Sequence, residues 1–147
     1  MTSAPSTWAT RRLDEIVSGQ AVLPPVVQRL GLGGLGEWGV GWIKKRWEPH
    51  PELLNVDGSL FGGYIAALAD QALAFAAMTV VPADSVFRTI NLNVNFIRVG
   101  RAHPLVIEAV VVAQTRQMLT VRAMLKREDG ELIADASAQQ VLQPFPG

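Results

Sequence analysis

The chain has 147 residues, of which 49% are hydrophobic, with 13 basic residues, 13 acidic residues and no cysteine. This composition excludes disorder, disulfides, thiolate metal sites and a cysteine nucleophile. The balanced charge provides no global field that would attract nucleic acid or an anionic membrane. The first twenty residues carry charges where a signal peptide needs an apolar core, so we expect a cytoplasmic protein.

The N-terminal part of the sequence predicts two short helices and a linker. Residues 7–18 have Thr7 as a candidate N-cap, and residues 24–31 begin with a proline pair and end at Gly31. The glycines of residues 31–36 match a dinucleotide-binding pattern, but that pattern needs a strand before it and a helix after it. We therefore expect a flexible linker, with residues 1–34 as an N-terminal region and 35–147 as the main domain.

The main domain reads as one strand, one long helix and four more strands. Residues 37–48 alternate like a strand, with Trp38, Val40 and Trp42 on one face. Asp57 and Gly58 predict a turn, and an apolar helix follows from about residue 62 to residue 80. Short connections predict antiparallel neighbours among the remaining strand candidates, which are residues 86–98, 104–115, 117–127 and 131–142. This order predicts an α+β fold, with a curved antiparallel sheet wrapped around one long central helix.

This helix has too little polar surface to be exposed on any side, so it reads as the most buried segment of the chain. Asp70 stands in its middle, and the position of this carboxylate poses the main functional question. Its carboxylate argues against a membrane span, although the segment is about long enough for one. Its neighbours on the helical wheel are nearly all small, so a partner helix or a thin ligand could approach closely: Gly63, Ala66, Ala67, Leu73, Ala74 and Ala77. A structural hydrogen bond inside the core is the alternative role for this carboxylate.

Gly62 and Gly63 leave backbone N–H groups unobstructed at the positive end of the same helix. Such groups can stabilise a developing oxyanion, although the glycines would also permit close packing. Gly62 and Asp70 are eight residues apart, which is about 12 Å along a helix. One reacting group cannot touch both within a chain, so we predict a site shared between two antiparallel copies of the helix.

The segment from Asn55 to Asp70, with Gly58, Ser59 and the pair Gly62–Gly63 between them, carries a family resemblance. It resembles the signature of hotdog-fold acyl-CoA thioesterases of the PaaI-like group, in the 4-hydroxybenzoyl-CoA thioesterase superfamily. Residues 88–100 and 116–142 resemble the later strands of that family. The resemblance implies a hotdog fold and hydrolysis of an acyl-CoA thioester to a carboxylate and CoA. It also implies a homodimer or a dimer-of-dimers tetramer, with no metal and no cofactor beyond the CoA of the substrate.

The resemblance also implies roles for individual residues. Asp70 would be the general base or the nucleophile, Asn55 would position water or the thioester, and the Gly62 N–H would be an oxyanion donor. Thr89 would line the site, on a strand face that it shares with Asn91, Asn93 and Asn95. The other candidates for substrate binding are Phe61 and Gly63 beside the thioester. Arg98, Arg101 and Arg116, at strand ends and turns, are candidates for the CoA phosphates.

Phe61 stands where the family has a histidine. The pocket is then either more apolar with the histidine dispensable, or the activity is weakened, altered or lost. Phe61, Tyr64 and Phe75 are candidates for an apolar acyl pocket. Three alternatives to a thioesterase stay open: a hotdog dehydratase acting on hydroxyacyl thioesters, a non-catalytic acyl-CoA binder, and a structural dimer.

Overall fold

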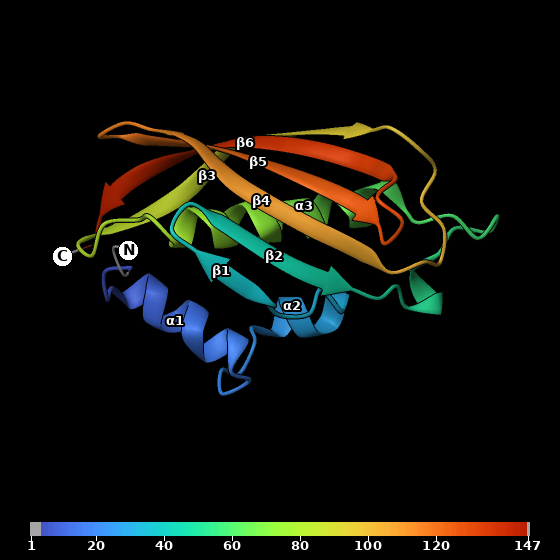
Figure 1. Cartoon of the computed structure of the whole chain (residues 1–147), viewed down its shortest axis with the longest axis horizontal. Coiled ribbons are helices and arrows are strands. Elements are labelled where there is room, and N and C mark those ends of the chain that lie inside the picture. Colours follow the sequence, from blue (N-terminus) through green and yellow to red (C-terminus); the bar gives the residue numbers. More distant parts are fainter. Residues whose placement is uncertain (1–3, 147) are drawn as a thin grey trace.

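A computed structural model describes residues 4–146 as one antiparallel sheet with helices on its concave side (Figure 1). The sheet order is β1-β2-β4-β5-β6-β3. The strands are β1 (Glu37–Gly39), β2 (Trp42–Trp47), β3 (Ser85–Phe96), β4 (Leu105–Gln114), β5 (Met118–Arg127) and β6 (Leu132–Pro144). The helices are α1 (Trp8–Val17), α2 (Pro25–Leu30) and α3 (Gly62–Met78), with a short 3-10 turn at Pro51–Leu53. The predicted α+β architecture is confirmed.

The predicted pairing of the last three strands is also confirmed, since β4 pairs with β5 and β5 with β6, both antiparallel. The single strand predicted for residues 37–48 is wrong. The chain turns back at Val40–Gly41, and Glu37 of β1 lies opposite Lys44 of β2. Gly41 makes this turn possible with a φ of +86°, a left-handed conformation that favours glycine.

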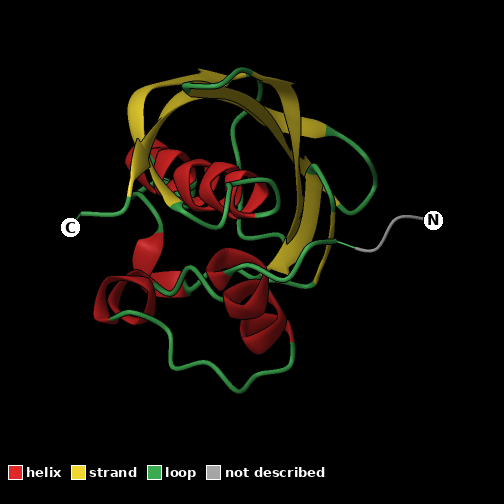
Figure 2. Ribbon diagram, turned by 90° about the vertical axis from the view of Figure 1, so that its left-hand side faces the viewer, coloured by secondary structure: helices red, strands yellow, loops and turns green. Residues whose placement is uncertain are grey.

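The core lies between the concave face of the sheet and α3, over which the sheet arches (Figure 2). Leu68, Ala72 and Leu73 of α3 are fully buried, as are Ile107 and Leu119 of the sheet. The sheet does not enclose the helix completely, because part of the small-residue face of α3 is half-buried or exposed in the chain. The expectation that α3 has no exposed side is therefore wrong for this face.

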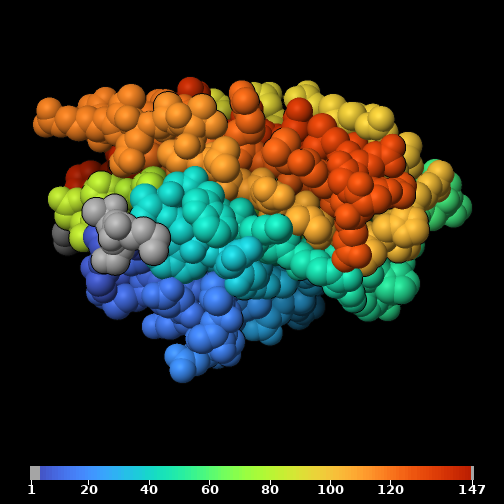
Figure 3. Space-filling model, in the orientation of Figure 1, coloured from blue at the N-terminus to red at the C-terminus, as the bar shows by residue number. Residues whose placement is uncertain are grey.

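The N-terminal helices form a continuous layer along one side of the molecule (Figure 3). Thr7 caps α1 through a reciprocal pair of hydrogen bonds with Thr10, which confirms the predicted N-cap. Trp8 fixes this helix to the main domain. Its indole N–H donates to the Ser85 carbonyl at 2.9 Å. Its ring packs edge-on against the Phe145 ring, with the two ring centroids 5.8 Å apart.

Residues 31–36, the expected flexible linker, pack against α3 instead. Leu32 and Leu35 are buried. The Lys45 ammonium donates to the Leu32 carbonyl at 2.6 Å and to the Gln71 side-chain oxygen at 2.5 Å. The Gln71 amide in turn donates to the Gly33 carbonyl at 2.7 Å. This hydrogen-bonded group, the Lys45–Gln71 clamp, holds the segment on the helix.

Lys45 lies at the base of this clamp and is only 3% exposed. It has no carboxylate partner among residues 4–146, so burial penalises its charged form. Desolvation lowers the pKa of Lys45 to about 8. Folding therefore favours the neutral amine, whereas the unfolded chain keeps a lysine pKa near about 10.4.

We expect the free energy of unfolding to rise between pH 8 and pH 10. In this window the unfolded chain binds more protons at Lys45 than the folded chain, so stability increases with pH. The largest gain is about 3 kcal/mol, from roughly 1.4 kcal/mol per pKa unit. Urea unfolding at pH 7, 8, 9 and 10 measures it. Above pH 10, Tyr64 opposes the rise, because desolvation raises its pKa in the folded chain.

Lys44→Met is the matched control, because Lys44 neighbours Lys45 on β2 but is exposed. It should keep the rise, whereas Lys45→Met should remove it. A wild-type protein with no increase in stability over this range would contradict the assignment.

Candidate active site

The first backbone N–H groups of α3 are free to bind a ligand. Phe61 is the N-cap residue, and its side chain makes no capping hydrogen bond. The N–H groups of Tyr64 and Ile65 donate to the Phe61 carbonyl, at 2.9 and 3.2 Å. Those of Gly62 and Gly63 have no acceptor among residues 4–146. They lie at the positive end of a 17-residue helix, where a developing negative charge is stabilised.

Two phenyl rings flank these N–H groups. A Cβ added at Gly63 would lie 2.7 Å from the Phe61 ring, and one at Gly62 would lie 3.3 Å from the Phe96 ring. Both rings are more than half exposed, at 58% for Phe61 and 56% for Phe96. The helix N-terminus therefore opens into an apolar surround. The sequence analysis missed Phe96, whose only signal was a large apolar residue at the end of a strand rich in asparagine.

Asn55 lies on the turn that leads into α3, as predicted. Its amide donates to the Ser59 hydroxyl at 2.9 Å. The Asp57 carboxylate accepts from the Ser59 hydroxyl at 2.6 Å and from its N–H at 3.0 Å, and these bonds lower the pKa of Asp57. Arg101, one of the candidates for the CoA phosphates, donates instead to the Asp57 carbonyl at 3.0 Å. The turn is thus fixed from both sides, and it holds Asn55 in place.

Asp70 is exposed on the single chain, so the expectation of a buried carboxylate is wrong. Sequence reasoning placed it inside because its segment is apolar, but it lies on the open face of α3. Its neighbours there are exposed or half-buried small residues: Gly63, Ala66, Ala67 and Ala74. The carboxylate makes no hydrogen bond or ion pair with any residue from 4 to 146. Partial desolvation raises the pKa of Asp70, which makes it a stronger base than an ordinary surface aspartate.

Thr89 does not share a face with the asparagines of β3. A β-bulge between Thr89 and Asn91 shifts the register and places Thr89 opposite Gln140, which is fully buried on the inner face of the sheet. Thr89 itself lies on the edge strand and stays exposed. Asn91 bonds instead to Gln139, and Asn95 bonds to Asp135, each at 2.8 Å on the exposed outer face. The predicted polar face that included Thr89 is therefore wrong. Nothing in the sequence marks the bulge.

Arg98 and Arg116 lie at opposite ends of the sheet. The backbone N–H of Arg98 donates to the Ile133 carbonyl, near the start of β6. Arg116 lies in the turn between β4 and β5, and the carbonyl of the next residue, Gln117, accepts from the Leu142 N–H near the end of β6. Residues 133 and 142 are nine steps apart on β6, which is roughly 30 Å. The Arg98 side chain also pairs with Glu131 at 2.7 Å. A CoA molecule bound to one chain could not contact both arginines.

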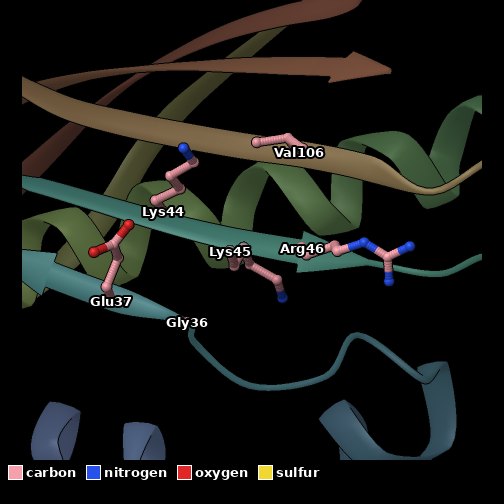
Figure 4. Close-up of a pocket in the computed structure, with 6 residues that line it drawn as sticks. All are labelled: Gly36, Glu37, Lys44, Lys45, Arg46 and Val106. Atoms are coloured by element: carbon pink, nitrogen blue, oxygen red, sulfur yellow. The ribbon is translucent and has the colours of Figure 1, made fainter. Parts of the chain in front are cut away.

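The pocket in Figure 4 lies away from all of these residues. It has a volume of about 430 Å³ and is lined by Gly36, Glu37, Lys44, Lys45, Arg46 and Val106. It includes none of the predicted site residues. Within residues 4–146, no cluster of three or more histidine, aspartate or glutamate side chains is arranged to hold a metal ion. None of the described helices has the length and apolar character needed to cross a membrane.

Comparisons with known proteins identify the family and the fold of the chain. Residues 57–134, more than half of the chain, match the family model of the thioesterase superfamily. No match is found among curated proteins. In structure, the chain is similar to a phenylacetic acid degradation-related protein from Ralstonia eutropha JMP134. That match has a TM-score of 0.78 and 25% identity, over 88% of this chain and 98% of that one.

Two further solved structures show the same fold. A thioesterase from Haemophilus influenzae has a TM-score of 0.80 and 17% identity, over 100% of this chain and 98% of that one. A protein from Streptococcus mutans, bound to acetyl CoA, has a TM-score of 0.69 and 20% identity, over 75% and 87% of the two chains.

Proposed function

This chain belongs to the thioesterase superfamily and has the hotdog fold, and on that premise we propose that it hydrolyses an acyl-CoA thioester to a free carboxylate and CoA. The observation that carries the proposal is the pair of chemical groups on α3. Its start carries N–H groups, and its open face a carboxylate of raised pKa, for which residues 4–146 provide no partner. The acetyl-CoA complex of the Streptococcus mutans protein supports a CoA thioester as the ligand.

In our proposal, two copies of the chain build each site. Gly62 and Asp70 are about 12 Å apart along α3, so a single chain cannot apply both to one carbonyl. Two antiparallel copies of α3 would bring Gly62 of one copy beside Asp70 of the other. The small side chains of Ala66 and Ala67 leave room for this approach. The protein would then be a homodimer or a dimer-of-dimers tetramer.

The reaction follows from these positions. The thioester oxygen accepts a hydrogen bond from the Gly62 N–H, which stabilises the oxyanion as it forms. Asp70 removes a proton from water, whose oxygen bonds to the carbonyl carbon, and Asn55 orients that water. The carbon–sulfur bond then breaks, and the thiolate of CoA takes up a proton as it leaves. Direct attack by Asp70, with water cleaving the resulting anhydride, is the alternative order of steps.

The substrate-binding residues complete the proposal. Phe61, Gly63 and the inner-face Thr89 would surround the acyl group, and Arg98 or Arg116 would contact a CoA phosphate from one subunit or the other. The chemistry uses no metal and no redox cofactor, and we place it in the cytoplasm.

Release of free CoA thiol from acetyl-, hexanoyl-, decanoyl-, phenylacetyl- and benzoyl-CoA tests the function. The proposal expects turnover of at least one of these substrates. Binding of acyl-CoA without any release would instead support the non-catalytic binder. Phe61 favours that second candidate, because a phenyl ring cannot donate a hydrogen bond where the family has a histidine.

We expect Phe61→His to raise kcat by roughly fivefold, because one added hydrogen bond in the transition state contributes about 1 kcal/mol. Steady-state kinetics on the best substrate of the panel measures the change. Phe96→His is the matched control, since Phe96 flanks the same helix end and is equally exposed. An unchanged or lower kcat for Phe61→His would show that the apolar ring suits this site better than the histidine.

A further inference from the structure

A separate small pocket lies between the N-terminal helices and α3. It has a volume of about 160 Å³, and its wall comes from Ile16 of α1, from Leu23 and Val27 at α2, and from Gln71, Phe75 and Met78 of α3. A dry apolar cavity of about 150 Å³ is large enough for a benzene-sized group. The pocket can therefore hold about six carbon atoms.

The wall that the pocket presents to a ligand is almost wholly apolar. Gln71 borders it, but the Lys45–Gln71 clamp uses both ends of its amide. Arg12 also borders it, and its guanidinium donates to the Val22 carbonyl at 2.9 Å. A polar occupant would lose its hydrogen bonds to water without replacement, so the pocket selects an apolar one.

The pocket lies on the side of α3 next to the face that carries Asp70, since Gln71 lines it. Gln71 is the next residue after Asp70 in the chain. On a helix of 3.6 residues per turn, the direction of the side chain rotates by about 40° for every four residues. Ala74 is therefore about 40° from Asp70 around the helix, and Met78, which lines the pocket, is about 80° from it. Ala67 and Ala74 between them carry only methyl groups and are half-buried. Short side chains therefore border the way from the carboxylate to the pocket.

We propose that this pocket receives the distal end of a straight acyl chain of about eight to twelve carbons, in the subunit that supplies Asp70; this rests on the proposed thioesterase function. Phe75 and Met78 lie five and eight residues beyond Asp70, roughly 7 and 12 Å along the helix. An extended carbon chain reaches about 1.3 Å per carbon, so about six carbons lead to the level of Phe75. The ring of a benzoyl or phenylacetyl group is attached too close to the carbonyl to reach the pocket.

The test variant is Val27→Trp, whose indole fills the pocket. The control is Val26→Trp, because Val26 precedes Val27 on α2, is 59% exposed and does not line the pocket. The measured quantity is the ratio of kcat/KM for decanoyl-CoA to that for acetyl-CoA within each protein. We expect this ratio to fall at least tenfold in Val27→Trp and to stay at the wild-type value in Val26→Trp. Met78→Ala, which enlarges the pocket, should shift the preferred chain towards tetradecanoyl-CoA.

Equilibrium binding of a non-hydrolysable decanoyl-CoA thioether separates this inference from the proposed function. If no protein releases CoA but Val27→Trp alone loses the thioether, the pocket holds the chain and the hydrolytic function is wrong. If wild type hydrolyses acyl-CoA but Val27→Trp and Met78→Ala keep its chain-length profile, the hydrolytic function stands and the pocket assignment is overturned.

Discussion

Replacing Asp70 with asparagine should lower kcat/KM for acyl-CoA hydrolysis by about 10²- to 10⁴-fold, the usual contribution of a general base. Asparagine has nearly the same shape and cannot accept the proton of the attacking water. The side chain is exposed on the single chain and bonds to no residue from 4 to 146, so the fold should survive the change. Release of CoA thiol, measured beside the far-ultraviolet circular dichroism, checks both statements.

Asp84→Asn is the matched control, because Asp84 is an exposed aspartate in the loop before β3, beyond the far end of α3. It should keep wild-type activity. The raised pKa of Asp70 adds a second readout, since only the deprotonated carboxylate acts as a base. The kcat/KM of the wild type should therefore fall on acidification at a higher pH than an ordinary aspartate would give. Undiminished hydrolysis by Asp70→Asn would reduce Asp70 to a structural role.

Replacing Ala66 with arginine should convert the protein to a monomer and lower hydrolysis at least a hundredfold. Ala66 lies midway between Gly62 and Asp70 on α3, so it would meet its own copy at the two-fold axis of the proposed dimer. It is half-buried, and in the single chain an arginine can extend into solvent. Light scattering of the eluted protein gives the mass, and CoA release gives the activity.

Ala113→Arg serves as the comparison, since Ala113 is an exposed alanine on β4. It should leave both mass and activity unchanged. A wild-type chain that is monomeric at micromolar concentration, yet hydrolyses acyl-CoA, would rule out the shared site.

Much of the fold could be predicted because its patterns are local. The apolar run that begins at Gly62 predicted α3, and the short connections predicted the β4–β5 and β5–β6 hairpins. Thr7 and Gly31 marked the ends of the N-terminal helices. The resemblance around Asn55, Gly62 and Asp70 pointed to the candidate site; Asn55 lies on the turn before α3, and Gly62 is the first residue of the helix.

The rest depended on contacts between distant parts of the chain. The alternation of Trp38, Val40 and Trp42 continues across the turn at Gly41, so periodicity alone could not reveal the β1–β2 hairpin. The bulge that turns Thr89 inward depends on its pairing with β6, about fifty residues later. The exposure of Asp70 depends on how much of α3 the sheet covers, and an apolar helix sequence does not state which side stays open.

The anchoring of Trp8 has a consequence for the order in which the molecule is completed. A ribosome makes α1 before α2, α3 and the strands. The carbonyl that Trp8 bonds to belongs to Ser85, 77 residues later, and the ring that it packs against belongs to Phe145. Contacts this distant in sequence form slowly, because a large loop must close before they add any stability. Since α1 and α2 also close the pocket over α3, that pocket is finished only when the strands are in place. Although α1 is made before the rest of this fold, it is thus among the last elements to dock.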